Sequence, residues 1–225
     1  MDIFQPDAIK SVCRIIVIIF SDYYKAYGSH KVLSIPDLTI PDGVHWIQGV
    51  NGSGKSTLLK SIAGIIPFVG SIYINNYNVK KDPVQSRRQV AYSEAEPIYP
   101  EFLNAREIIE YVAEMRGING KKITEIGRYF DMISFQDQAI GGYSTGMLKK
   151  LSLTLAFAGP IPWILLDEPF AFIDRETEEK LVSLIKIRNN AGINFIITSH
   201  HDLDHTEISF DSVFKINENE LLKIR

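Results

Sequence analysis

One stretch in the first quarter of the chain combines glycines with a lysine and hydroxyl side chains. Gly49-Val50-Asn51-Gly52-Ser53-Gly54-Lys55-Ser56 fits the spacing G-x-x-x-x-G-K-[ST], and Thr57 follows. Glycines let the backbone curl so that successive N–H groups point at phosphate oxygens. Lys55 would place its charge on the β- and γ-phosphates of a nucleotide, and Ser56 would offer its hydroxyl to Mg²⁺. The stretch therefore predicts a site for nucleotide phosphates.

Two acidic residues follow a short apolar run much later in the chain. Ile164-Leu165-Leu166 leads directly into Asp167-Glu168-Pro169. Ligands of open α/β sheets bind beyond the carboxyl ends of the strands, so we expect both acids at the phosphate site. Asp167 would hold Mg²⁺, directly or through water, and Glu168 would orient or deprotonate an attacking water molecule. An acidic turn is common by itself, but together with the glycine-rich stretch it predicts nucleotide hydrolysis.

The elements that position these residues can be predicted from apolar periodicity. Asn104, with Glu107 three residues on, predicts the start of one helix. Strands that alternate with helices favour an α/β sheet with buried parallel strands, and the helical middle of the chain favours an inserted subdomain. The expected strands cover residues 11–20, 37–42, 44–50, 71–74, 90–92, 163–166 and 194–198, and the expected helices cover 58–66, 104–116, 122–132, 145–158 and 175–188.

A short polar turn, Tyr143-Ser144-Thr145-Gly146-Met147, precedes one of these helices. By itself the turn predicts only a helix N-cap at Ser144. The turn lies ahead of Asp167 with one helix between them, and this position, more than its residues, makes it a candidate functional motif.

The motifs, in this order, resemble the nucleotide-binding domain of ATP-binding cassette (ABC) transporters. Gly49–Thr57 matches the Walker A motif and Ile164–Pro169 the Walker B motif, while Tyr143–Met147 resembles the signature motif. The resemblance covers residues 12–225. It also places Asp174 in the D-loop, His200 at the switch histidine and Tyr27 where an aromatic ring stacks on adenine.

The resemblance implies a P-loop NTPase (RecA-like) core with an N-terminal antiparallel β subdomain and an inserted helical subdomain. Residues 1–225 would form one ABC ATPase domain. Its core would cover about 1–95 and 159–225, and its helical subdomain, with the signature motif, about 96–158.

The family also implies a partner and a mechanism. A second copy of the chain, or a homologous ATPase subunit, would meet this one head to tail and enclose two ATP molecules. Ser144, Thr145 and Gly146 of one subunit would contact the γ-phosphate that Lys55 of the other binds. His200 would link that phosphate to Glu168. Hydrolysis would drive transport through a separate transmembrane permease, and the small size and the YS-x-GM form of the signature favour export.

Two positions depart from the family pattern. The family has a glutamine or glutamate near Mg²⁺, but the best register puts Ala95 there, so Glu94 substitutes after a one-residue shift or the contact is lost. His200 and His201 compete for the switch position, and we prefer His200 because the preceding strand sets its place. A zinc pair of His201 and His205 has no supporting motif.

The overall charge and the apolar runs limit the kinds of partner and location that we expect. A net charge of −3 gives no reason to expect nucleic acid as a partner. No apolar run is long and uninterrupted enough to span a bilayer, so we expect a cytoplasmic protein, peripheral on a bacterial membrane. Tyr99, Phe102 and Leu103 form either a docking patch for the permease or a packing contact. The alternatives to transport are an ABC ATPase that acts on a macromolecule and a regulatory nucleotide-binding module.

Overall fold

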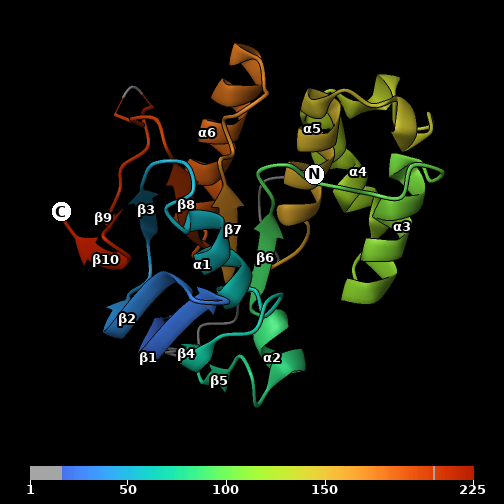
Figure 1. Ribbon diagram of the computed structural model, residues 1–225. Coiled ribbons are helices and arrows are strands. Elements are labelled where there is room, and N and C mark those ends of the chain that lie inside the picture. The colour runs from blue at the N-terminus through green and yellow to red at the C-terminus, as the bar shows by residue number, and fades with distance from the viewer. Residues whose placement is uncertain (1–16, 205) are drawn as a thin grey trace.

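The computed structural model describes residues 17–204 and 206–225. One sheet with the strand order β5-β4-β1-β2-β10-β9-β3-β8-β7-β6 runs through the described chain (Figure 1). The strands are β1 (Ile18–Tyr27), β2 (His30–Ile40), β3 (Val44–Gln48), β4 (Val69–Ile74), β5 (Tyr77–Asn78), β6 (Val90–Ser93), β7 (Trp163–Asp167), β8 (Asn194–Ser199), β9 (Ser212–Asn217) and β10 (Glu220–Lys223).

The sheet has a parallel part and an antiparallel part. Strands β6, β7, β8, β3 and β9 pair in parallel. Strand β1 pairs antiparallel with β2 and β4, and β10 pairs antiparallel with β9. All parallel strands therefore end at one edge of the sheet, where residues 49 and 168 begin their loops.

The parallel strands are buried on both faces. Every residue of β7 and of β8 is buried, as expected when helices cover both sides of a sheet. Alternate residues enter two separate apolar clusters. Ile164 and Leu166 pack with helix α6 (Arg175–Asn190), whereas Leu165 packs with helix α1 (Lys55–Ile62) on the opposite face.

Helices occupy the chain between β6 and β7. They are α3 (Ala105–Arg116), α4 (Gly120–Tyr129) and α5 (Thr145–Ala156), with short 3₁₀ turns at Met132–Ser134 and Ile140–Gly142. Figure 1 shows them gathered at one side, beyond strand β6. The predicted cap is confirmed, since Glu107 N donates to Asn104 Oδ1 at 3.0 Å and Asn104 N to Glu107 Oε2 at 2.8 Å.

The predicted α/β fold is confirmed, but several boundaries were wrong. The predicted helix 58–66 begins at Lys55 and ends at Ile62, because Gly54 turns the chain directly into the helix. The predicted strand 37–42 is the end of a longer strand, β2. Five pieces of secondary structure were missed: β5, the helix α2 (Pro83–Arg87), β9, β10 and the first half of β2.

Two predictions touch residues outside the described part. Residues 11–16 of the first predicted strand lie there, and β1 begins at Ile18. His205 also lies outside the described residues. Among the residues the structure describes, no helix is long and apolar enough to cross a membrane.

Candidate nucleotide site

A cavity of about 1040 Å³ lies at the edge where the parallel strands end. This volume is close to the upper end of the range for small-molecule sites. The predicted residues that line it are Tyr27, Asn51, Gly52, Gly54, Lys55, Ser56, Thr57, Glu168 and His200. Of the described site residues, those without a place in its lining are Gly49, Val50, Ser53, Ser144, Thr145, Gly146, Asp167 and Asp174.

The glycine-rich loop turns sharply into helix α1. Gly54 has φ of +105°, which an L side chain rarely adopts, and a Cβ placed there would lie 2.9 Å from Val32 Cγ1. Helix α1 starts at the next residue, so the unpaired N–H groups of its first turn face the cavity lined by Lys55, Ser56 and Thr57. Such a helix end favours phosphate.

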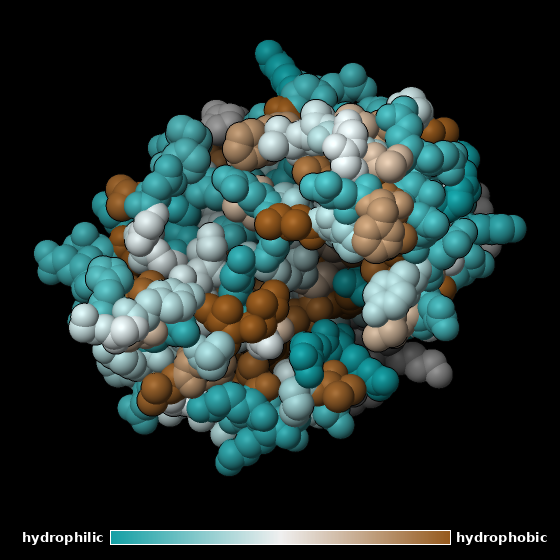
Figure 2. Space-filling view, turned by 45° about the vertical axis from the view of Figure 1, so that its right-hand side comes forward, coloured by the Kyte–Doolittle hydropathy of each residue, from teal (hydrophilic) through white to brown (hydrophobic). Residues whose placement is uncertain are grey.

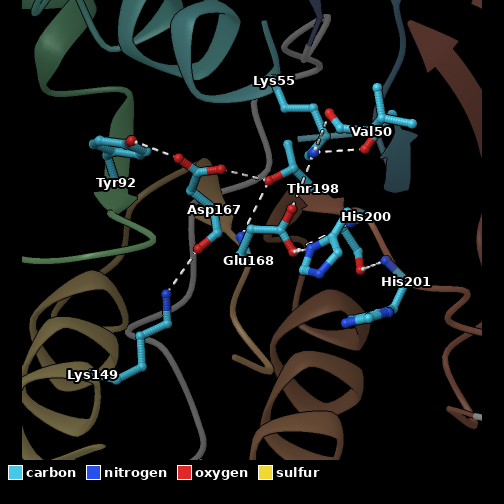
Figure 3. A network of polar contacts seen from close by, with 11 residues as sticks. Val50, Lys55, Tyr92, Lys149, Asp167, Glu168, Thr198, His200 and His201 are labelled. Carbon is cyan, nitrogen blue, oxygen red and sulfur yellow. Dashed lines mark hydrogen bonds and ion pairs between the residues drawn. The ribbon is translucent and has the colours of Figure 1, made fainter. Parts of the chain in front are cut away.

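Lys55 is nearly buried, and its ammonium is bound on two sides. Its Nζ donates to Gly49 O at 2.6 Å and to Val50 O at 3.2 Å. It also lies 3.2 Å from Glu168 Oε1. Lys55 thereby connects the glycine-rich loop with the acid that follows β7 (Figure 3).

Glu168 is held between a lysine and a histidine. Its Oε2 lies 2.9 Å from His200 Nδ1, opposite the contact of Oε1 with Lys55. Its backbone has φ of +44°, a strained value for a side chain of this kind, and such strain collects at functional sites. Lys55, Glu168 and His200, which lie far apart in the sequence, thus meet at the Glu168 carboxylate.

Asp167 lies behind the cavity and is almost fully buried. Thr198 Oγ1 donates to its Oδ1 at 2.7 Å, and Tyr92 OH donates to its Oδ2 at 3.1 Å. Burial, with Asp167 close by, raises the pKa of Tyr92, so this phenol stays a donor. Each carboxylate oxygen keeps a second lone pair. A hydroxyl at Ser56 and a carboxylate at Asp167 are hard oxygen ligands of the kind that Mg²⁺ prefers.

Tyr27 lies at the cavity rim. Its ring is about half exposed, and Lys25 Nζ lies 4.4 Å from the ring centroid. Lys25 Nζ also donates to Pro67 O at 2.7 Å, which anchors the cation under the ring. An exposed, oriented ring of this kind offers a face on which a base can stack.

The signature and D-loop residues cap two helices. Met147 N donates to Ser144 Oγ at 3.2 Å, which confirms the predicted N-cap. Asp174 caps α6 by accepting from Thr177 N at 2.8 Å, and its carboxylate lies 3.3 Å from Lys150 Nζ. These contacts lower the pKa of Asp174 to about 2, and the hydrogen bond from Thr177 N has the largest effect.

The segment after β6 separates the two candidates for the missing family contact. Ala95 and Glu96 line the cavity. Glu94 pairs instead with Lys60 on α1, with 3.0 Å between Oε1 and Nζ. The carboxylate of Glu94 is thus turned to α1. The acid of this segment that lines the cavity is Glu96, which was not a candidate in the sequence interpretation.

The two histidines are also distinguished by their contacts. Only His200 has a bond to Glu168 among the described contacts. The ring of His201 packs on that of His200, with 3.8 Å between centroids, and also lines the cavity. No cluster of three or more metal-binding side chains occurs in the described residues.

Three polar residues of the site were missed by sequence reasoning: Tyr92, Thr198 and Lys149. Tyr92 and Thr198 belong to strands that were predicted only as buried elements. The sequence motifs assign no role to Lys149, but the residue is fully buried on α5. Burial lowers its pKa to about 8, against the raising effect of Asp167, Glu168 and Glu94. A lysine on the apolar face of a predicted helix was the available signal.

Comparisons with known proteins show the family of the chain. The family described as "ABC transporter" matches residues 34–171. The linearmycin resistance ATP-binding protein LnrL of Bacillus subtilis is 25% identical over 89% of this chain and 66% of its own length. The spermidine/putrescine import ATP-binding protein PotA of Fusobacterium nucleatum is 27% identical over 89% of this chain. The chain spans only 54% of PotA.

A solved structure agrees as well. A chain described as an ATP binding subunit of an ABC transporter superposes with a TM-score of 0.81 and 25% identity, over 93% of this chain and 90% of that one. The fold is therefore a P-loop NTPase fold. The chain belongs to the ABC transporter family, and its fold is that of the family's ATP-hydrolysing cassette.

Proposed function

We propose that this chain is the ATP-hydrolysing subunit of a transporter and works with a separate transmembrane permease. The single observation that carries the proposal is the meeting of Lys55, Glu168 and His200 in a cavity of nucleotide size. Lys55 binds the β- and γ-phosphates, and Tyr27 stacks on adenine. A phosphate oxygen that enters the loop competes for Lys55 Nζ with the carbonyl oxygens and Glu168, and so releases the Glu168 carboxylate.

The reaction is attack of water on the γ-phosphorus. Glu168 accepts a proton from that water as the new P–O bond forms, and the bond to the β–γ bridging oxygen breaks to give ADP and phosphate. His200 holds Glu168 in place and contacts the γ-phosphate. Ser56 and Asp167 would hold Mg²⁺, which neutralises phosphate charge when bound.

The proposed active assembly is a dimer. Ser144, Thr145, Gly146 and Asp174 lie outside the cavity lining, so they are available to a nucleotide held by another subunit. The N-terminus of α5, capped by Ser144, would present its N–H groups to that γ-phosphate. The second subunit is another copy of this chain or a homologous ATPase subunit, and the head-to-tail arrangement follows from the family resemblance.

The permease contact is proposed on the helical side of the chain. Phe102 and Ile98 are more than four-fifths exposed, whereas Tyr99 and Leu103 pack against the core. The exposure of Phe102 and Ile98 supports a docking role for this pair, and the packing of Tyr99 and Leu103 supports a structural role for the other two. Figure 2 shows a hollowed face with hydrophobic side chains exposed among hydrophilic ones.

The direction that we propose is export, on the YS-x-GM form of the signature, and the place is the cytoplasmic face of a bacterial membrane. The test is to look for a multi-spanning membrane protein in the neighbouring reading frames, to co-express it with the chain, and to measure co-purification and Mg²⁺-dependent ATP hydrolysis. Stable co-purification with hydrolysis supports the proposal. Hydrolysis without membrane association would favour the alternative, an ABC ATPase that acts on a macromolecule.

A further inference from the structure

Lys149 is a buried lysine to which neither the motifs nor the proposed reaction assigns a part. It lies on α5, five residues after the signature Ser144, and its side chain is 0% exposed. Its Nζ donates to three main-chain oxygens: Glu94 O at 2.7 Å, Asp167 O at 2.8 Å and, more weakly, Ala95 O at 3.4 Å. An ammonium has three donors, so its bonding capacity is used completely.

The bond to Asp167 O has a specific geometric consequence. That oxygen belongs to the peptide group whose N–H is that of Glu168, and this N–H donates to Thr198 Oγ1 at 3.2 Å. A peptide group is planar, so a partner at each end fixes the orientation of the whole plane. Figure 3 shows Lys149 and Thr198 on either side of this peptide group.

The same peptide group leads into the strained part of the backbone. Glu168 has φ of +44° and relaxes toward negative φ unless its neighbours hold it. Rotation of the preceding peptide plane would swing the Glu168 carboxylate away from Lys55 and His200. The bonds to Glu94 O and Ala95 O fix the cavity wall after β6 to the same ammonium.

We propose that Lys149 is a positioning residue for hydrolysis: it fixes the Asp167–Glu168 peptide plane, and with it the carboxylate of Glu168, to the helix that carries the signature motif. The inference rests on the proposed role of Glu168 in hydrolysis. It links two sites through one side chain. A shift of Ser144 on its helix moves Nζ, and Nζ moves the carbonyl next to the catalytic acid of the same subunit.

A buried lysine can also act on stability alone, and kinetics separate the two roles. Lys149→Met keeps an unbranched apolar side chain of similar length and removes the three N–H donors of the ammonium. A displaced carboxylate lowers kcat by about ten- to a hundredfold. The KM for ATP stays within about threefold, because Lys55 and the glycine-rich loop are unchanged. Lys149→Gln keeps two N–H donors and should recover part of kcat.

The matched control is Arg116→Met. Arg116, on α3, donates through one nitrogen to Leu155 O and Ala158 O. These oxygens lie at the C-terminal end of α5, the helix that carries Lys149, and just beyond it. Its loss should reduce the melting temperature and leave kcat unchanged. Wild-type hydrolysis and its loss in Glu168→Gln report on the proposed function itself, independently of the Lys149 variants.

The measurement is steady-state ATP hydrolysis by the full chain, per folded protein, beside thermal unfolding. A lower kcat with unchanged KM in Lys149→Met, partly recovered in Lys149→Gln, supports the proposal. If Lys149→Met does not fold, a reduced kcat in folded Lys149→Gln supports it. Wild-type kcat in folded Lys149→Met, a loss confined to KM, or failure of both variants to fold would overturn it; if only Lys149→Gln folds, wild-type kcat in that variant would do so.

Discussion

Lys55 Nζ and Glu168 Oε1 lie 3.2 Å apart, so the lysine of the glycine-rich loop and the acid after β7 form an ion pair. The pair is largely shielded from water, with side-chain exposures of 6% and 14%. One ammonium thus contacts both the loop that would hold the phosphates and the group that would activate water. A movement of the Lys55 ammonium toward a phosphate would therefore also free the Glu168 carboxylate from its ion pair.

Lys55→Ala removes the charge that we assign to the β- and γ-phosphates. We expect the Kd for ATP to rise at least about tenfold, which corresponds to roughly 1.4 kcal/mol. Lys60→Ala is the matched control on the same helix, since Lys60 pairs with Glu94 on the partly exposed surface. Its effect should stay within about twofold. Titration of both variants with ATP measures the two Kd values. Equal ATP affinities of Lys55→Ala and Lys60→Ala would refute the assignment of Lys55.

Thr198→Val removes the hydroxyl that donates to Asp167 and accepts from Glu168 N. Because the hydroxyl and the Asp167 carboxylate are both buried, we expect a loss of about 1–3 kcal/mol in unfolding free energy together with a fall in kcat. Thr154→Val removes another buried hydroxyl, which donates to Met132 Sδ at 3.1 Å away from the cavity lining. Chemical denaturation and hydrolysis assays should show a stability loss in both variants but a kcat loss only at Thr198. A normal kcat in Thr198→Val would contradict the role of this hydroxyl.

Gly54→Ala places a methyl group 2.9 Å from Val32 Cγ1 at φ of +105°. We expect about 1–3 kcal/mol of strain and weaker ATP binding, because the loop must deform. Gly28 also has positive φ, but a Cβ there would meet nothing within 4 Å. Gly28→Ala should cost about 1 kcal/mol with no change in ATP affinity. Equal ATP affinities of the two variants would show that the shape of the loop at Gly54 is unimportant.

Phe102→Ser changes an exposed ring, and Tyr99→Ala changes one that packs on the core. We expect Phe102→Ser to reduce co-purification with the permease and to leave the melting temperature unchanged. Tyr99→Ala should lower the melting temperature, because it removes a ring that packs against the core; burial of this phenol also raises its pKa to about 12. The docking proposal fails if Phe102→Ser retains full permease binding.

The sequence predicted that the glycine-rich loop and the two acids lie at one edge of the sheet, and the structure places them there, because each follows a buried strand with a strong apolar signal. Glu168 and His200 were both identified from motifs, and their bond required only that neighbouring strands β7 and β8 end together. The strands β9 and β10 were missed although both lie inside the sheet, between β2 and β3, because runs of four to six residues carry little periodicity.

The buried polar contacts could not be predicted in the same way. Lys149 reads as a surface lysine until α5 is placed against β6 and β7. Glu94 and Ala95 were left open by the sequence, and only the ion pair with Lys60 showed where the Glu94 carboxylate points. Such contacts depend on tertiary packing, which no local pattern of residues records.

Glu168→Gln provides the most direct test of the proposed hydrolysis site, because it keeps the size of the side chain and removes its basicity. The measurement is ATP binding and ATP turnover on the same purified sample, with its mass in solution followed as ATP is added. We predict ATP affinity close to that of the wild type, turnover reduced by about a hundredfold or more, and a dimer that persists in ATP. Turnover at the wild-type rate would contradict the assignment of Glu168 and the mechanism built on it.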